Sequence, residues 1–190
     1  PKEWLSSQAE LQEQIVARER EFNMQPVLPA FAGHVPAALK RVYPNIKTSR
    51  VSEWGGFADQ YRCTFLNPMD SLYAIIQKEY LTEQTRLYGT NHIYGIDPFN
   101  EIDPPSWDAD SLGMMAKHIY ESVAAVDPEA VWLQMTWLFY ADIKHWTTPR
   151  IKSYLRSVPQ DKLILLDYFC EYTETVSYTH LRAHETRRHL

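Results

Sequence analysis

The sequence contains few cysteines, no excess of basic residues and no long apolar segment, and each shortage excludes a class of protein. Its two cysteines, Cys63 and Cys170, lie far apart without metal-ligand spacing, so neither a zinc site nor a disulfide framework is predicted. We expect both to be buried thiols. Because the formal net charge is −5, the chain lacks the basic face that nucleic-acid binding needs. No apolar run is long enough to span a bilayer, and no segment resembles a secretory signal.

The chain is instead rich in apolar and aromatic side chains. Hydrophobic residues make up 45% of its 190 positions and aromatic residues 13%. Such a chain can bury a core, and its length fits one domain or part of one. A neutral, sugar-like ligand suits this composition better than an anionic polymer.

Helical patterns alternate with short apolar strands along the chain. Strands are predicted at 26–32, 92–98, 130–137 and 162–168, and helices at 7–23, 36–43, 67–89, 108–127 and 149–158. This order predicts an α/β fold with a parallel sheet. Four βα units are too few to close an eight-stranded barrel of roughly 250 residues. We therefore expect a partial (β/α)8 TIM barrel, strands three to six of a larger one, over residues 1–175.

Capping residues mark the expected helix ends. Ser7 and a glutamate three residues later form a capping box that predicts the start of the first helix. Asn67 is the predicted N-cap of the 67–89 helix, and Gly89 follows its last turn. Asp108 or Asp110 is expected to cap the next helix.

The carboxyl ends of the predicted strands carry the residue types of a sugar pocket. In parallel barrels the chemistry lies at these ends, where the loops converge. An acid can protonate a glycosidic oxygen, an amide can hold a hydroxyl, and flat aromatic faces can hold a ring. The strand ends supply His34, Asn100, Glu101, Thr136, Trp137, Asp167 and Tyr168.

Four long runs resemble one family of glycoside hydrolases. They are PVLPAFAGHVPAAL (26–39), HIYGIDPFNEIDPPS (92–106), AVDPEAVWLQMTWLF (125–139) and LILLDYF (163–169). Together they are similar to the alpha-N-acetylglucosaminidase family. The resemblance implies a (β/α)8 catalytic domain that hydrolyses terminal alpha-linked N-acetylglucosamine with retention, by two glutamates.

The resemblance also implies roles for single residues. Glu101 falls on the position of the general acid/base, and Asn100 on a neighbouring substrate contact. Trp54, Trp137 and Tyr168 fall on positions that line the pocket. The nucleophile lies on a later strand, beyond this chain, so the chain alone is expected to be inactive. No cofactor is implied.

Other interpretations remain open for several of these residues. Glu101 could be a structural carboxylate paired with an arginine, and the tryptophans could belong to the core. His34 is a candidate substrate contact, or a histidine bonded to a loop carbonyl. Asp97, before a proline, is expected to tie down its loop. For the whole protein, a non-catalytic carbohydrate-binding barrel or an endo-glycanase is the alternative function.

The last segment, 176–190, departs from the family pattern and is predicted to be a non-native or disordered tail. Its histidines, His180, His184 and His189, lack a strong metal-binding spacing, so no metal site is predicted. No membrane partner is expected, and the full-length enzyme could be a homo-oligomer. A secreted or periplasmic location is expected in a bacterium and a lysosomal one in an animal.

Overall fold

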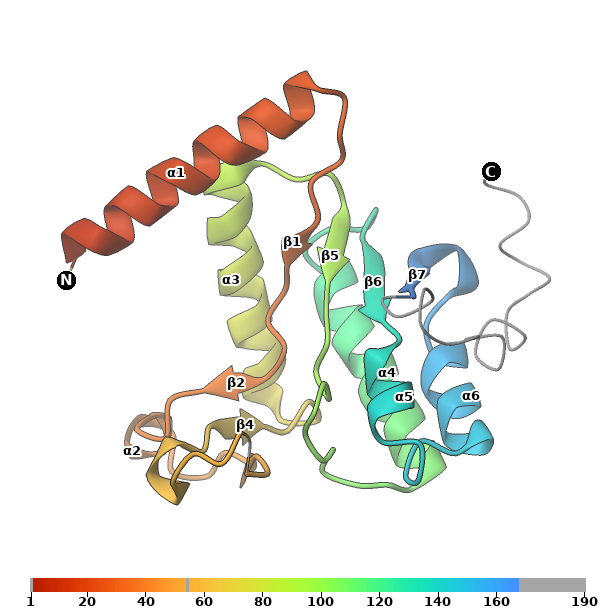
Figure 1. The fold of residues 1–190 in the computed structure, drawn as a ribbon. Helices are drawn as coiled ribbons and strands as arrows, with labels where there is room; N and C mark the ends of the chain where they lie inside the picture. Colours follow the sequence, from red (N-terminus) through yellow and green to blue (C-terminus); the bar gives the residue numbers. More distant parts are fainter. Residues whose placement is uncertain (1, 54, 168–190) are drawn as a thin grey trace.

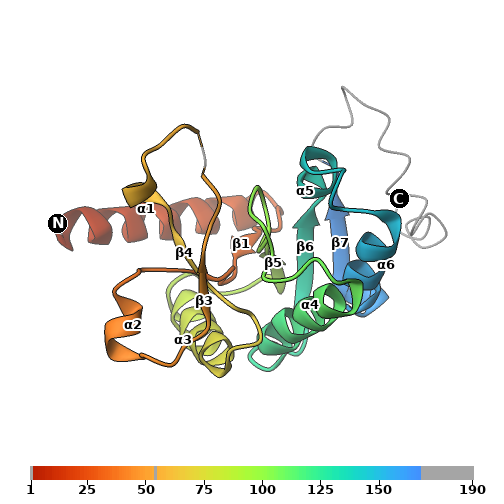
Figure 2. The same cartoon turned by 90° about the horizontal axis from the view of Figure 1, so that it is seen from below.

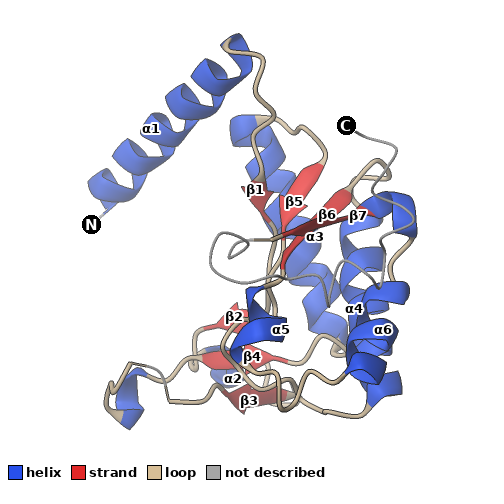
Figure 3. Cartoon of the chain, turned by 45° about the vertical axis from the view of Figure 1, so that its right-hand side comes forward, coloured by secondary structure: helices blue, strands red, loops and turns tan. Residues whose placement is uncertain are grey.

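The structure, a computed structural model, describes residues 2–53 and 55–167 (Figure 1). Within these residues the strands form two sheets, one parallel and one antiparallel. The two sheets lie one above the other in Figure 3. The larger sheet carries the core, and the smaller one covers one end of it.

The larger sheet has four parallel strands in the order β1-β5-β6-β7. They are β1 (Leu28–Pro29), β5 (Ile93–Gly95), β6 (Val131–Met135) and β7 (Leu163–Leu166). Helices α3, α4 and α6 lie along one side of this sheet (Figure 2). Each strand is followed by a helical segment before the next parallel strand, which is the connection that parallel pairing requires. The predicted α/β class is confirmed.

Helix α1 (Lys2–Glu21) precedes this sheet and runs across the end of α3 (Figure 1). It begins well before Ser7, so the predicted capping box is wrong: Ser7 lies inside the helix and donates its hydroxyl proton to a carbonyl of the preceding turn. Val16 is its one buried side chain among those described. Arg20 anchors its end by donating to the Tyr88 carbonyl at 2.7 Å.

Helix α3 (Ser71–Tyr88) starts later than its sequence pattern suggested. Its N-cap is Asp70, whose carboxylate accepts from a backbone N–H of the first turn. The expected cap, Asn67, instead accepts from the Met69 N–H at 2.9 Å in the turn before the helix. Gly89 ends the helix as predicted, with a φ of 69° that favours glycine.

Helix α4 (Ala109–Ala124) is capped by Asp108, which decides between the two candidate aspartates. Its partner α6 (Thr148–Arg156) approaches closely at Gly113. A Cβ atom there would lie 2.6 Å from the Ser153 hydroxyl oxygen and 3.2 Å from its carbonyl oxygen, so a larger residue would force that hydroxyl to turn away.

The smaller sheet is antiparallel, in the order β2-β4-β3. Its strands are β2 (His34–Val35), β3 (Thr48–Arg50) and β4 (Thr64–Leu66). The short helix α2 (Leu39–Val42) lies between β2 and β3 in the chain. Sequence patterns had indicated only irregular structure between 43 and 67. The prediction therefore missed a hairpin that contributes one wall of the candidate site.

The core centres on aromatic side chains of β6 and α6. Trp132 is 1% exposed, and its indole N–H donates to the Ile96 carbonyl at 2.6 Å. The Tyr154 ring meets Trp132 edge-on at 5.9 Å and lies 6.0 Å from the Phe99 ring. Because Phe99 directly precedes Asn100, this cluster anchors the loop that carries the candidate acid.

Candidate active site

The loop after β5 holds Glu101 in an uncommon backbone conformation. Its φ is +55°, in the left-handed region that costs a non-glycine residue roughly 1–2 kcal/mol. The neighbouring Phe99 is 1% exposed and fixes the start of the turn. Such strain persists where the surrounding structure enforces it, and it concentrates at functional positions.

Glu101 meets Trp137 across the ends of two neighbouring strands. The Trp137 indole N–H donates to Glu101 Oε1 at 3.0 Å. Trp137 is the first residue of the short helix α5 (Trp137–Ala141), directly after Thr136. The buried Thr136 donates from both its backbone N–H and its hydroxyl to the Leu166 carbonyl, at 3.0 and 3.2 Å. The carboxyl ends of β5, β6 and β7 therefore hold this pair in place.

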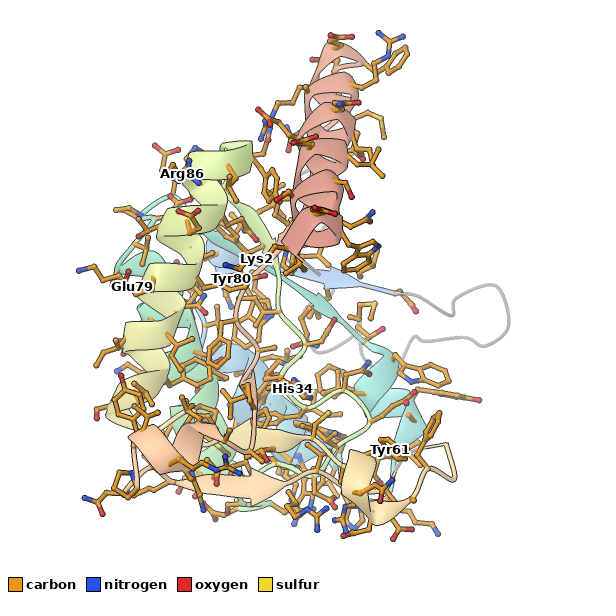
Figure 4. All side chains as sticks on the ribbon, turned by 90° about the vertical axis from the view of Figure 1, so that its left-hand side faces the viewer. Lys2, His34, Tyr61, Glu79, Tyr80 and Arg86 are labelled. Carbon is orange, nitrogen blue, oxygen red and sulfur yellow. The ribbon has the colours of Figure 1, made fainter. Side chains whose placement is uncertain are left out.

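A pocket of about 680 Å³ opens between the Glu101 loop and the smaller sheet. Its lining residues are His34, Val51, Ser52, Phe57, Tyr61, Arg62, Cys63, Asn100, Glu101 and Ile102. In Figure 4 the labelled His34 lies near the centre of the molecule, while Tyr61 lies toward its edge. The volume suits a small ligand such as a sugar ring.

Asn100 is half-buried beside Glu101. Its Oδ1 atom is buried and has no hydrogen-bond partner among the described residues. A buried amide oxygen without a partner costs roughly 1–3 kcal/mol. An N–H or O–H group that reached this atom would remove that cost.

His34 faces the same pocket from β2. Its ring meets Phe65 edge-on at 5.7 Å, and burial lowers the pKa of His34 below its usual value. The imidazole is therefore neutral at pH 7 and can both donate and accept a hydrogen bond. Gly33 places it there with a φ of 105°, and a Cβ on Gly33 would lie 2.5 Å from the Phe65 ring.

Cys63 lines the same pocket from the side of the smaller sheet and is exposed, so the expectation of a buried thiol is wrong for this residue. It precedes β4, whose Phe65 and Leu66 supply the buried side chains of that hairpin. Cys170 lies outside the described residues.

The tip of this hairpin is held by ion pairs. Asp59 accepts from Arg50 at 2.6 Å and from Arg62 at 3.0 Å. Hydrogen bonds from Arg50 and then Arg62 lower the pKa of Asp59. Arg62 also donates to the Val51 carbonyl, which joins the tip to the body of the hairpin. Sequence analysis missed these residues because no alternating pattern marks the hairpin.

Behind the site, Asp97 links β5 to β6. Its Oδ1 accepts from the Met135 backbone N–H at 3.1 Å and from the Gln134 side-chain amide. The Tyr154 hydroxyl donates to the oxygen of that amide at 3.1 Å. Burial raises the pKa of Asp97 to about 6, although the Met135 and Gln134 hydrogen bonds oppose the shift.

Asp97→Asn is expected to remove a pH dependence of stability. Since folding raises the pKa of Asp97 from 3.8 to about 6, the folded chain keeps a proton that the unfolded chain has lost. The free energy of unfolding should therefore fall by on the order of 3 kcal/mol as the pH rises through this window. Urea unfolding of both proteins from about pH 3 to 7.5 measures it. The free energy of unfolding of Asp97→Asn should rise relative to that of the wild type as the pH rises. A difference between the two proteins that does not change with pH would contradict the raised pKa of Asp97.

A second, smaller pocket of about 240 Å³ lies on the other side of Glu101, next to α5. Asp103 and Asp142 also line it. Among residues 2–53 and 55–167 no group of three His, Cys, Asp or Glu side chains could hold a metal ion. The tail histidines lie outside these ranges.

The structure thus brings together four of the six predicted site residues. Asn100, Glu101 and His34 line the pocket of about 680 Å³, and Trp137 contacts Glu101 directly. The other two, Trp54 and Tyr168, lie outside the described residues. The roles of all six stay predictions.

The parallel sheet, its outer helices and a carboxylate at a strand end define a segment of an α/β barrel of the kind that carries enzyme sites. The chain belongs to the family of the alpha-N-acetylglucosaminidase (NAGLU) TIM-barrel domain, whose model matches residues 1–187. This match confirms the predicted partial barrel and the family resemblance.

Known relatives agree with this assignment. The chain is 42% identical to a human protein named alpha-N-acetylglucosaminidase over 183 residues, covering 94% of the chain and 25% of that protein. It resembles the structure of a family 89 glycoside hydrolase from Clostridium perfringens in complex with PUGNAc, with a TM-score of 0.79 at 22% identity over 96% of the chain and 20% of that structure.

A further C. perfringens structure carries two glutamate-to-glutamine substitutions and is in complex with its substrate GlcNAc-alpha-1,4-galactose. The TM-score is 0.75 at 22% identity, over 91% of the chain and 19% of that structure. The chain therefore spans about a quarter or less of the length of these relatives. Within its described part, no helix is long and apolar enough to cross a membrane.

Proposed function

We propose that the full-length protein containing this chain is a retaining exo-glycosidase that releases terminal alpha-linked N-acetylglucosamine. The observation that carries the proposal is Glu101, a carboxylate in a strained turn at the carboxyl end of β5, beside a pocket of about 680 Å³. The 42% identity to the human alpha-N-acetylglucosaminidase supports the choice of sugar and of linkage.

In this proposal Glu101 is the general acid/base. It protonates the leaving glycosidic oxygen and later takes a proton from the water that attacks the glycosyl-enzyme. The hydrogen bond from the Trp137 indole N–H to Oε1 holds the carboxylate in place. A second carboxylate, about 5–5.5 Å away, attacks the anomeric carbon. We assign that nucleophile to a later strand of the barrel, outside this chain.

The other predicted site residues hold the sugar. Asn100 offers a buried acceptor without a partner among the described residues, which suits a substrate N–H or hydroxyl. The neutral His34 imidazole suits a second hydroxyl. From the family resemblance, Trp54 and Tyr168 complete the pocket together with Trp137.

The test is activity and stereochemistry. The full-length protein should hydrolyse an aryl alpha-N-acetylglucosaminide but not the corresponding aryl beta-N-acetylglucosaminide. Proton NMR at early times should show alpha-N-acetylglucosamine as the first product, because two successive displacements retain the configuration. The 190-residue chain alone should be inactive. Beta anomer as the first product, or cleavage inside a chain, would contradict the proposal.

The same experiment separates the alternatives. A carbohydrate-binding barrel would bind N-acetylglucosamine in calorimetry without hydrolysing any glycoside, and an endo-glycanase would release oligosaccharides. We further propose a secreted, periplasmic or lysosomal location for the full-length protein. Its oligomeric state, and the nature of segment 176–190, stay predictions.

A further inference from the structure

Asp97 is a half-buried carboxylate close to the site, and the proposed chemistry gives it no role. It lies four residues before Glu101, on the same strand-to-loop connection. Its Oδ1 atom accepts two hydrogen bonds from β6, one from the Met135 backbone and one from the Gln134 side chain. Met135 and Gln134 lie two and three residues before Trp137 in the chain.

We propose that Asp97 is a positioning residue that sets the direction of the Glu101 carboxylate by fixing Trp137 opposite it. The inference rests on the proposed role of Glu101 as acid/base. The two strands are joined twice at their carboxyl ends, at Asp97 and again at Glu101. The two links close a ring through the loop after β5 and the start of α5.

Buried hydrogen bonds hold this ring in place on the β6 side. On the β6 side, Gln134 is fully buried, and the Tyr154 hydroxyl donates to its Oε1 atom. Because a carboxylate oxygen can only accept, the amide nitrogen of Gln134 faces Asp97 and its oxygen faces the Tyr154 hydroxyl. Directly after this strand, Thr136 donates to the Leu166 carbonyl. The start of α5 therefore follows the position of Asp97 closely.

Loss of the Asp97 acceptor would take this partner from the Met135 N–H and leave the Gln134 amide nitrogen with only its bond to the Met135 carbonyl. The end of β6 would then shift, and Trp137 with it. A displacement of about 1 Å at a reacting group can cost on the order of 100-fold in rate. Protonation of the leaving group is the step that depends on the Glu101 direction.

The experiment compares Asp97→Ala with Asp97→Asn in the full-length enzyme. The asparagine keeps Oδ1 and both hydrogen bonds, whereas the alanine removes them. Asp97→Ala should lower kcat/KM by on the order of 10-fold to 100-fold for a glycoside with a poor leaving group. For an activated aryl glycoside, which needs little protonation, it should lower kcat/KM less than about 3-fold. Asp97→Asn should stay within about 3-fold of wild type on both. Asp110→Ala, at an exposed position of α4, is the control.

A double-mutant cycle tests the route through Trp137. In a Trp137→Phe background, which lacks the indole N–H, Asp97→Ala should cost little more, because both changes break the same ring. Equal losses on both substrates, or full additivity with Trp137→Phe, would overturn the inference. If Asp97→Ala does not fold, Gln134→Leu removes one of the two donors and is expected to show the same dependence on leaving group.

A failure of the positioning role of Asp97 can be told apart from a failure of the acid/base role of Glu101. If Glu101→Gln shows the dependence on leaving group and Asp97→Ala does not, only the positioning role fails. If Glu101→Gln itself shows none, the proposed acid/base role fails first.

Discussion

Glu101→Gln in the full-length protein is expected to lower kcat/KM for a natural alpha-N-acetylglucosaminide by roughly 10²–10⁴, the range that general acid catalysis contributes. Glutamine keeps the shape of the side chain and can still accept from the Trp137 indole, but it cannot deliver a proton. For an aryl glycoside with a good leaving group, kcat/KM should survive, since glycosylation then needs no acid. Steady-state kinetics on the two substrates measures the difference.

The second half-reaction gives an independent reading of the same variant. Without a base to activate water, the glycosyl-enzyme should accumulate, and kcat for the aryl substrate should fall. Added azide needs no base, so it should restore turnover and yield an alpha-glycosyl azide. Glu121→Gln, an exposed position on α4, is the matched control. If both substrates suffer equally and azide has no effect, Glu101 is not the acid/base.

Trp132→Ala is expected to lower the free energy of unfolding of the barrel by roughly 3–5 kcal/mol, the usual cost of truncating a buried aromatic residue. Trp132 is 1% exposed and joins β6 to the Tyr154 ring, so its removal leaves a cavity in the middle of the core. It also strips the Ile96 carbonyl of its indole donor. Urea denaturation followed by circular dichroism measures the change.

Two further variants divide this loss into its parts. Trp132→Phe keeps much of the volume but removes the indole N–H, so it should cost less than the alanine variant. Met114→Ala, at a position of α4 that is 54% exposed, should change stability by less than about 0.5 kcal/mol. Equal effects of Trp132→Ala and Met114→Ala would mean that Trp132 is not part of the packed core.

The parts of the fold that the sequence predicted are those with strong periodic signals. Apolar runs identified all four strands of the parallel sheet, and Gly89 and Asp108 marked real helix ends. Asn67 was mistaken for a cap because an Asx turn and an N-cap use the same side-chain chemistry. Ser7 was misjudged because helix α1 already begins at Lys2, so the Ser7 hydroxyl bonds a carbonyl inside the helix and does not cap its start.

Apart from His34, the candidate site was predictable only on the side of the parallel sheet. Strand-end reasoning reached Asn100, Glu101 and Trp137, because the ends of parallel strands converge. The opposite wall comes from an antiparallel hairpin whose β3 reads Thr-Ser-Arg, without an apolar alternation. Its contribution depends on pairing with β4, a contact between distant residues that local patterns do not encode. Cys63 was misplaced for the same reason.

Because the backbone at Glu101 is left-handed, stability and activity favour different residues at this position. Glycine adopts a φ of +55° without the steric cost that a side chain pays there, so Glu101→Gly relieves strain while it deletes the proposed proton donor. A directed-evolution screen that rewards heat resistance alone would therefore favour inactive clones at this position. Selection on turnover has to accompany selection on melting temperature whenever this barrel is engineered.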